Sequence, residues 1–553
     1  MAKKRILLVG ESGWTLNTGF STIHKELITR LIATNKYEIA ELASYVNPGD
    51  PKLLDAPWKV YTAVPEDNNK IAQSRYNSSI YGQFGEAVFE QVCLQFMPDY
   101  VFSVVDSWML HEWIRNSPYL KYFKLISMPT VDGFPQRLEW IDGYKQADLL
   151  LTYSRFGKET LEKESGGKLK VFDIGRPGVD SNVFVPLDKV KIKQKYGISP
   201  NSMVIGTVMR NQKRKLFPDL IDMFTGYINK CKLLKNDHLA NNTYLLLHTS
   251  YPDVGYDIGR HIMQSGIGHK ILCSYTCKNC GITYVDFFQT ELSTCKQCKT
   301  AALHMPNSGS GATRKQLCEI YNLMDLYIQY SISEGFGMGI AEAKSCEIPA
   351  FAVDHSAMTE QVEVEGCQKI KVKRLFSESC METEQLRALP DNYDCIEKIY
   401  NFFTTPKAQR ERWGKLARKD VEWNHSFDRF AKVVENAIDI LDCDPIEKTW
   451  LNSTANFAPL NLEMPKFETN KNIVNWGITN ILGKKDLLNT VWASDLMKGL
   501  NVGYLTERGA RKPCTPESVI NMFIGMAQEH NFWEKARLNS FKFKSDMVKY
   551  DIY

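Results

Sequence analysis

The chain has 553 residues, of which 44% are hydrophobic and 24% charged, and its formal net charge is +4. This length predicts two or three domains, and the composition is typical of a globular protein and excludes a largely disordered chain. No apolar run approaches the roughly 20 residues of a membrane span, and the N-terminal stretch lacks a signal-peptide pattern. We therefore expect a soluble, cytoplasmic protein whose 14 cysteines are reduced or bound to metal.

The first half alternates short apolar runs with amphipathic segments. Residues 5–10 (RILLVG) form a buried-strand pattern that ends in glycine, and residues 22–34 place isoleucine and leucine on one face of a helix. Further strand-like runs lie at 37–45, 99–106, 124–129 and 147–154. Strands that alternate with helices predict a parallel sheet covered by helices on both faces. We assign residues 1–185 to an N-terminal Rossmann-like lobe.

A polar segment with two prolines follows at 182–202, and a second series of strands and helices then begins. Its strand-like runs lie at 203–211, 243–250, 324–331 and 348–354. We assign 186–425 to a second Rossmann-like lobe, 426–442 to a returning helix and 443–553 to a mainly helical C-terminal extension. Two such α/β lobes predict a ligand crevice at the carboxyl ends of the strands.

A glycine-rich loop in the second lobe carries two acidic residues. In the segment SISEGFGMGIAEAKS, Glu334 and Glu342 are eight positions apart and flank three glycines that lead into a helix. Earlier, Arg210 and Lys215 follow a predicted strand end, where two cations suit a diphosphate. Taken alone, the two cations also fit a solvated basic turn.

Taken together and in this order, these segments resemble the retaining GT-B glycosyltransferases of the family 4 type (glycosyltransferase group 1). The E-x7-E element from Glu334 to Glu342 carries the resemblance most strongly, and residues 16–31, 146–161 and 176–186 of the first half are also similar. The resemblance spans roughly residues 4–442. It implies two Rossmann-like lobes that face a central cleft, with the nucleotide-sugar donor bound by the second lobe.

The resemblance also assigns roles to individual residues. Glu334 is implied to contact hydroxyls of the transferred sugar, Glu342 the ribose hydroxyls, and Arg210 with Lys215 the leaving diphosphate. Backbone N–H groups of the glycine loop would point at the donor from a positive helix N-terminus, where glycines permit close approach. The remaining implied donor-binding residues are Gly19, Gly335, Phe336, Gly337, Met338 and Gly339. No catalytic metal is expected.

The chain departs from the family pattern at three places. Glu347 stands where a glycine usually precedes proline, and Ser356–Ala357 replaces a usual glycine pair. The first half of such proteins often supplies a histidine to the sugar, and Asp132 lies near that place here. Asp132 is therefore a candidate catalytic contact to sugar or acceptor, with a turn-forming Asp-Gly as the alternative.

Four cysteines form a separate motif within residues 273–300. Cys277-x2-Cys280 and Cys295-x2-Cys298 are separated by fourteen residues, which is zinc-ribbon spacing. Cys273 and His304 flank the motif as alternative ligands. Four thiolates leave no open coordination position, so the motif predicts a structural zinc site.

We therefore expect a retaining glycosyltransferase, either hexosyl or pentosyl, that acts on a hydroxyl acceptor. The ribbon and the extension favour a macromolecular acceptor, including a modified nucleic-acid base, and basic segments at 410–419, 507–512 and 535–550 fit phosphate contacts. Two alternatives remain: a non-catalytic zinc-ribbon nucleic-acid-binding protein on a GT-B scaffold, and a transferase directed at polysaccharide or lipid. The sequence leaves the nucleotide, the sugar, the acceptor and the oligomeric state open.

Overall fold

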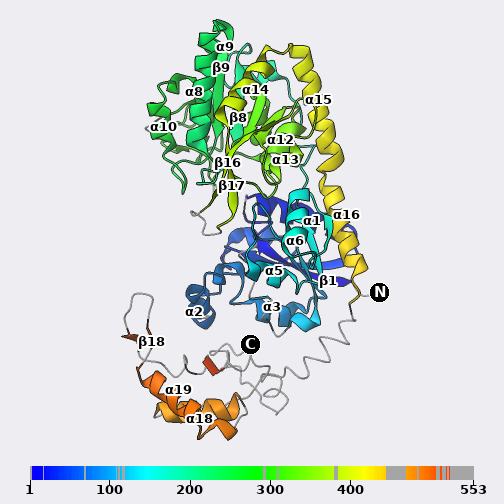
Figure 1. The fold of residues 1–553 in the computed structure, drawn as a ribbon, viewed down its shortest axis with the longest axis vertical. Helices are drawn as coiled ribbons and strands as arrows, with labels where there is room; N and C mark the ends of the chain where they lie inside the picture. Colours follow the sequence, from blue (N-terminus) through cyan, green and yellow to red (C-terminus); the bar gives the residue numbers. More distant parts are fainter. Residues whose placement is uncertain are drawn as a thin grey trace.

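The computed structural model describes residues 3–443, apart from the short gaps 17, 68–69, 107–108, 110–112, 115–116, 118, 290–293, 308–309 and 379–383. In the C-terminal region it describes 469–482, 485–502, 504–505, 511–512, 519 and 522–523. Two α/β lobes follow one another along the long axis of the molecule (Figure 1).

The first lobe contains one parallel sheet of seven strands in the order β3-β2-β1-β4-β5-β6-β7. Its strands are β1 (Lys4–Glu11), β2 (Tyr37–Ser44), β3 (Lys59–Thr62), β4 (Tyr100–Ser103), β5 (Lys124–Ser127), β6 (Leu149–Thr152) and β7 (Val171–Ile174). Its helices are α1 (Gly19–Ala33), α2 (Lys70–Ser78), α3 (Phe89–Phe96), α5 (Leu138–Tyr144) and α6 (Arg155–Glu164). The central strand β1 buries Ile6 to Val9 completely, because helices cover both faces of the sheet.

The second lobe is built on a sheet in the order β11-β10-β9-β8-β13-β14-β15, with β12 also paired to β10. Its strands are β8 (Met203–Val208), β9 (Thr243–His248), β10 (Ile271–Cys277), β11 (Thr283–Phe287), β12 (Leu303–His304), β13 (Leu326–Gln329), β14 (Ala350–Val353) and β15 (Gln368–Ile370). Its helices are α7 (Lys189–Lys195), α8 (Phe217–Leu233), α9 (Asp237–Asn242), α10 (Ile258–Gln264), α11 (Arg314–Asn322), α12 (Met338–Ser345), α13 (Met358–Gln361), α14 (Asn392–Thr404) and α15 (Lys407–Asn424). The two α/β lobes that the sequence predicts are therefore confirmed.

Two structures from the second half reach the first lobe. The long helix α15 continues into α16 (Phe427–Ile440), which runs down beside α1 (Figure 1) and is tied to it by Arg30 Nε–Asp428 Oδ1 at 2.6 Å. A hairpin of β16 (Val372–Ser377) and β17 (Leu386–Pro390) also descends, and Leu386 N donates to Phe134 O at 2.6 Å. Both α16 and the β16–β17 hairpin therefore join the second half of the chain to the first lobe.

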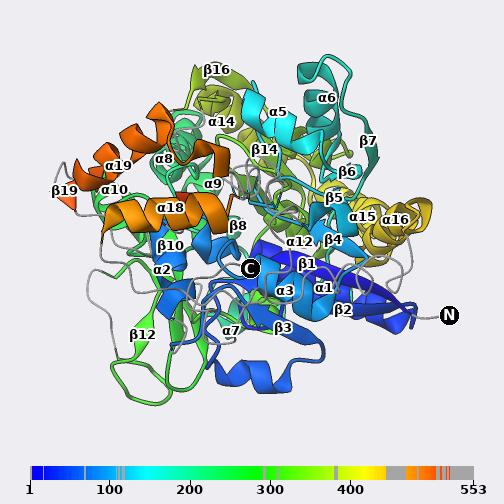
Figure 2. The ribbon, with the colours of Figure 1, turned by 90° about the horizontal axis from the view of Figure 1, so that it is seen from below.

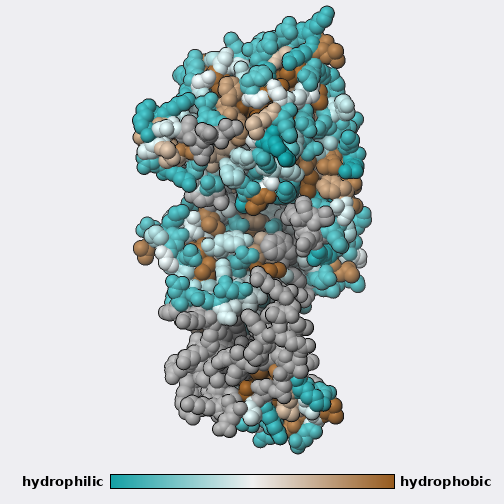
Figure 3. All heavy atoms as spheres, turned by 90° about the vertical axis from the view of Figure 1, so that its left-hand side faces the viewer, coloured by the Kyte–Doolittle hydropathy of each residue, from teal (hydrophilic) through white to brown (hydrophobic). Residues whose placement is uncertain are grey.

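The C-terminal elements lie beyond the first lobe. They are α18 (Asn470–Asn480), α19 (Val491–Val502), β18 (Tyr504–Leu505) and β19 (Arg511–Lys512). Figures 1 and 2 show α18 and α19 next to one another at this end. On the face drawn in Figure 3, apolar side chains are interspersed with polar ones over the second lobe. Within the described part of the chain, no helix combines the length and apolar character needed to cross a membrane.

Candidate functional site

Glu334 is the centre of a buried cluster of charges in the loop that follows β13. Its side chain is 7% exposed, and Oε2 accepts a hydrogen bond from Arg214 Nη1 at 2.8 Å. Oε1 accepts from Gln329 Nε2 at 2.6 Å and also from Lys215 Nζ. Backbone pairing between Lys215 and Ser331 brings the two loops together. Burial lowers the pKa of Lys215 well below its ordinary value, and the adjacent Arg214 cation lowers it further.

The structure therefore brings the predicted Lys215 and Glu334 together and adds Arg214, which the sequence interpretation missed. Arg214 stands within the run KRK at 213–215, and the choice of Lys215 alone overlooked this neighbour. An arginine here supplies a planar, permanently charged group beside the lysine. Two cations, not one, meet the Glu334 carboxylate.

Arg210 has a different partner. Its guanidinium forms a two-pronged ion pair with Asp253, with Nε–Oδ2 at 2.9 Å and Nη2–Oδ1 at 3.0 Å. Partial burial raises the pKa of Asp253, but hydrogen bonds from Arg210 and Ser250 outweigh it and hold the pKa at about 2. The Arg210 side chain is 51% exposed. Arg210 is thus accessible from solvent but held by a carboxylate.

Glu342 lies half-buried on α12 and contacts the neighbouring helix α11. Tyr321 donates a hydrogen bond from its hydroxyl to Glu342 Oε2 at 2.6 Å. Burial raises the pKa of Glu342 to about 7. Tyr321 is a second residue that sequence reasoning missed, because its contact joins positions 21 residues apart on separate helices.

The glycines of the loop allow close approaches that a side chain would block. A Cβ on Gly335 would lie 2.1 Å from Thr130 Cγ2 of the first lobe, and one on Gly339 would lie 2.4 Å from the Tyr327 hydroxyl. Gly337 has φ of +93°, in the left-handed region that favours glycine, and precedes α12. The loop is therefore packed against the opposite lobe.

The remaining predicted loop residues lie at the same junction. A Cβ on Gly19, the first residue of α1, would lie 3.9 Å from Met338 Cγ, the first residue of α12. The N-terminus of α1 in the first lobe therefore lies next to the N-terminus of α12 in the second lobe. Phe336 is 6% exposed, and its ring packs against His425 with centroids 5.5 Å apart. Its side chain therefore contributes to packing.

Asp132 is held by the second lobe. Its Oδ1 pairs with Arg387 Nη1 at 2.8 Å, its backbone O accepts from the same nitrogen at 2.7 Å, and its Oδ2 accepts from Ser333 Oγ at 3.1 Å. The Arg387 side chain is 1% exposed and comes from β17. Burial, followed by the charge of Asp132, raises the pKa of nearby Asp106 to about 6. Asp132 therefore stands beside Ser333, the residue that precedes Glu334.

Two positions where the family resemblance leads one to expect glycine adopt glycine-like backbone conformations. Glu347 has φ of +60° and Ser356 has φ of +54°. The Ser356 side chain holds the backbone of the E-x7-E loop: its Oγ accepts a hydrogen bond from Glu334 N at 2.9 Å. Ala357, the second residue of the expected glycine pair, has φ of −64°, so only Glu347 and Ser356 adopt the left-handed conformation that glycine favours.

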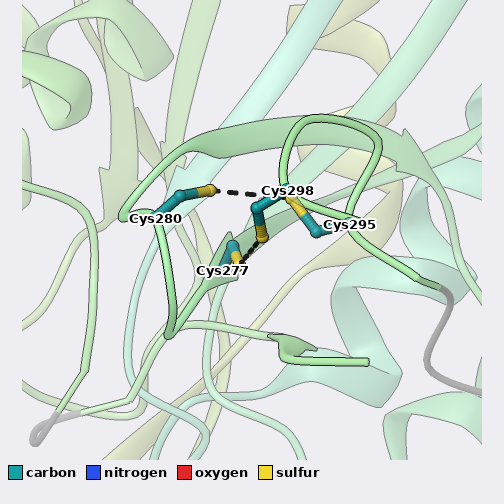
Figure 4. Close-up of side chains that lie close together, drawn as sticks. All are labelled: Cys277, Cys280, Cys295 and Cys298. Carbon is teal, nitrogen blue, oxygen red and sulfur yellow. Dashed lines mark hydrogen bonds between the residues drawn. The ribbon is translucent and has the colours of Figure 1, made fainter. Parts of the chain in front are cut away.

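The four predicted cysteines come together in one group. The sulfur atoms of Cys277, Cys280, Cys295 and Cys298 lie within 4.8 Å of one another (Figure 4). The group does not include the alternative ligands Cys273 and His304. The first cysteine of the group, Cys277, is the last residue of strand β10.

The basic segment at 410–419 is partly used within the fold. Arg418 donates to the carbonyl oxygens of Phe184, Ser345 and Ser181. The basic residues at 507–510 and 535–550 lie outside the described residues. Within the described residues, the three basic segments at 410–419, 507–512 and 535–550 therefore do not form one common surface.

The arrangement of two Rossmann-like lobes, with the E-x7-E loop at their junction, is the GT-B fold. Residues 308–374 match the family model described as glycosyl transferases group 1. That match contains both Glu334 and Glu342. No curated protein matches the sequence.

Solved structures with the same fold are distant in sequence. Sucrose-phosphate synthase from Thermosynechococcus elongatus is 13% identical, with a TM-score of 0.53 over 79% of this chain and 98% of its own. Anabaena HepE, solved with UDP and glucose, is 14% identical with a TM-score of 0.53, over 79% of this chain and 100% of its own. A Rickettsia africae glycosyltransferase is 14% identical with a TM-score of 0.54, over 82% and 100%.

Proposed function

We propose that this chain is a retaining glycosyltransferase that moves a sugar from a nucleotide-diphosphate sugar to a hydroxyl acceptor. The observation that carries the proposal is the buried Glu334 carboxylate, paired with Lys215 and Arg214 at the junction of the lobes. The group 1 family match over 308–374 supports sugar transfer. The structure of HepE in complex with UDP-glucose makes that compound a suitable first donor to test.

A diphosphate would compete with Glu334 for its two cations. Phosphate oxygens accept charge-assisted hydrogen bonds from lysine and arginine, so Lys215 and Arg214 can turn from Glu334 to the leaving group. The Glu334 carboxylate is then free to accept hydrogen bonds from sugar hydroxyls. The cations stabilise the negative charge that develops as the glycosidic bond breaks.

The start of α12 offers further donors to an anionic ligand. Its N-cap residue is Gly337, and no side chain forms a capping hydrogen bond there. The first N–H groups of a helix lack intrahelical partners and carry partial positive charge. We propose that Glu342, one turn further along α12, accepts hydrogen bonds from ribose hydroxyls when it is ionised.

Asp132 is our candidate contact on the acceptor side. It approaches the loop from the first lobe through Ser333, at 3.1 Å from Ser333 Oγ to Asp132 Oδ2. Its carboxylate can accept a hydrogen bond from an acceptor hydroxyl. Asp132→Asn should lower transfer more than donor hydrolysis, and equal losses in both reactions would place Asp132 outside the acceptor site.

The proposal is tested with UDP-glucose and other nucleotide sugars, by measuring binding and slow hydrolysis. Lys215→Met should lower turnover about 10²- to 10³-fold, the loss seen when one charge-stabilising group is removed. Glu334→Gln should also lower turnover, because it removes the carboxylate that accepts hydrogen bonds from the sugar hydroxyls. Lys213→Met is the matched control, because Lys213 belongs to the same loop but its ammonium lies over the Tyr256 ring. Full turnover in both site variants, or equal loss in the control, contradicts the proposed roles.

The acceptor is identified by a transfer screen. Hydroxylated bases in single-stranded DNA or RNA are compared with mono- and oligosaccharides and with lipid acceptors, using radiolabelled donor. We propose that a macromolecular acceptor gives the fastest transfer, and nucleic acid is the first such acceptor to test. Transfer only to sugars or lipids supports the polysaccharide- or lipid-directed alternative. Nucleic-acid binding without donor binding supports the non-catalytic alternative.

A further inference from the structure

The four sulfur atoms are spaced for a metal ion and not for disulfides. Cys277 Sγ lies 3.5 Å from Cys298 Sγ, and Cys280 Sγ lies 3.7 Å from Cys295 Sγ. A disulfide would place two sulfur atoms about 2.05 Å apart. Four sulfur atoms about 2.3 Å from a common centre in a tetrahedron are separated by roughly 3.8 Å. The observed separations agree with the tetrahedral arrangement.

The two cysteine turns have the same backbone geometry. After the first pair, Gly281 has φ of +69° and donates from its N–H to Cys277 O at 2.9 Å. After the second pair, Lys299 has φ of +59° and donates to Cys295 O at 3.0 Å. The left-handed conformation is unusual for lysine. Two equivalent turns that face each other place four thiolates around one point.

Groups around the sulfur atoms suit thiolates. The Tyr284 hydroxyl lies 3.4 Å from Cys295 Sγ, and the Thr300 hydroxyl lies 3.0 Å from Cys298 Sγ. Hydroxyl donors of this kind orient metal ligands from outside the first coordination sphere. The same turns carry the exposed side chains of Lys278, Lys296 and Lys299, of which Lys296 Nζ pairs with Asp286 Oδ2 at 3.3 Å.

The cysteine turns are joined to the sheet of the second lobe. Cys277 is the last residue of β10, which pairs with β11 along one edge and, along the other edge, with β9 at residues 271–273 and with β12 at residues 276–277. Cys277 and Cys295 are buried within the same hydrophobic core as β9. The insert thus extends the sheet and is not a separate appendage.

One hydrogen bond links the first turn to the candidate donor site. Gln316 Nε2 donates to Gly281 O at 2.8 Å, and Gln316 also forms the capping box of α11 with Thr313. The same helix carries Tyr321, which contacts Glu342. The position of the cysteine turns is therefore coupled to the start of the helix behind Glu342.

We propose that Cys277, Cys280, Cys295 and Cys298 bind one structural zinc ion, which fixes the insert on the edge of the sheet and supports the start of α11. A tetrahedral set of four sulfur ligands suits zinc, or iron as the alternative. No position is left for water or substrate, so the ion takes no part in chemistry. The effect on α11 matters for activity only if the proposed function is correct.

The first test is metal analysis of the full chain purified without chelator, and we expect one zinc ion per chain. Cys277→Ser/Cys280→Ser should lose the metal, whereas Cys273→Ala should keep it. Cys273 is the matched control because it is buried on the same strand, four residues before Cys277, and lies outside the sulfur group. Replacement by Co²⁺ should give the visible absorption of a tetrahedral thiolate complex. Iron in place of zinc, no metal, or zinc retained by the double variant overturns the proposal.

The second test is hydrogen exchange, which does not depend on activity. Loss of the ion in the double variant should increase exchange in 278–289, 294–305 and the first turn of α11, while β1 and β13 remain protected. Gln316→Ala should increase exchange at the start of α11 and retain the zinc. Unchanged exchange in the metal-free variant refutes the structural role. Failure of the proposed function would instead appear as no donor binding by zinc-loaded wild type.

Discussion

Gly335→Ala tests whether the glycine loop packs against the first lobe as the structure shows. The new Cβ would lie 2.1 Å from Thr130 Cγ2, whereas ordinary carbon contacts lie near 3.5–4.0 Å. The Thr130 side chain, the loop or the lobe must therefore move by more than about 1 Å. Such overpacking costs about 1–3 kcal/mol, and because about 1.4 kcal/mol corresponds to a tenfold change, we expect a loss of roughly 5- to 150-fold in UDP-glucose binding.

The control and the rescue for this variant come from the same geometry. Gly49→Ala meets no atom within 4 Å and should leave binding unchanged. Thr130→Ser removes Cγ2, after which the nearest Thr130 atom is Cβ at 3.5 Å, an ordinary contact. Gly335→Ala/Thr130→Ser should therefore recover most of the lost affinity, with a coupling energy of about 0.5–3 kcal/mol. Calorimetric binding equal to wild type in Gly335→Ala, or no rescue by Thr130→Ser, refutes the packing argument.

Three further predictions concern stability, each checked by thermal unfolding. Burial raises the pKa of Glu342 to about 7, so the folded state retains a proton that the unfolded state releases near pH 4.3. The stabilisation from the protonated Glu342 carboxyl is fully present below about pH 4.3 and is lost as pH rises through 7. Glu342→Gln should therefore make the free energy of unfolding depend less on pH, and an unchanged pH profile in this variant contradicts the prediction. Arg387→Met should cost about 3–5 kcal/mol by leaving Asp132 without its buried partner, and combining it with Asp132→Asn should cost less than the sum; additive losses argue against the pair. Glu347→Gly should stabilise the fold by up to about 1 kcal/mol, because φ of +60° disfavours a side chain; a lower melting temperature contradicts the strain argument.

The sequence by itself determined the features that depend on local pattern. Alternating strands and helices predicted two parallel α/β lobes, because a parallel sheet needs apolar strands buried on both faces and helical crossovers between them. The spacing from Cys277 to Cys298 predicted the sulfur group, since each pair lies within one tight turn. The E-x7-E spacing placed Glu334 in a loop and Glu342 on the following helix in the same way.

Only the tertiary structure decided which charged groups meet. Arg210 and Lys215 are five residues apart, yet one pairs with Asp253 and the other with Glu334, because each faces a different neighbouring loop. Asp132 forms an ion pair with Arg387, which lies 255 residues further along the chain. Such pairings depend on how sheets, hairpins and lobes pack in three dimensions, and residue periodicity carries information only about neighbours along the chain.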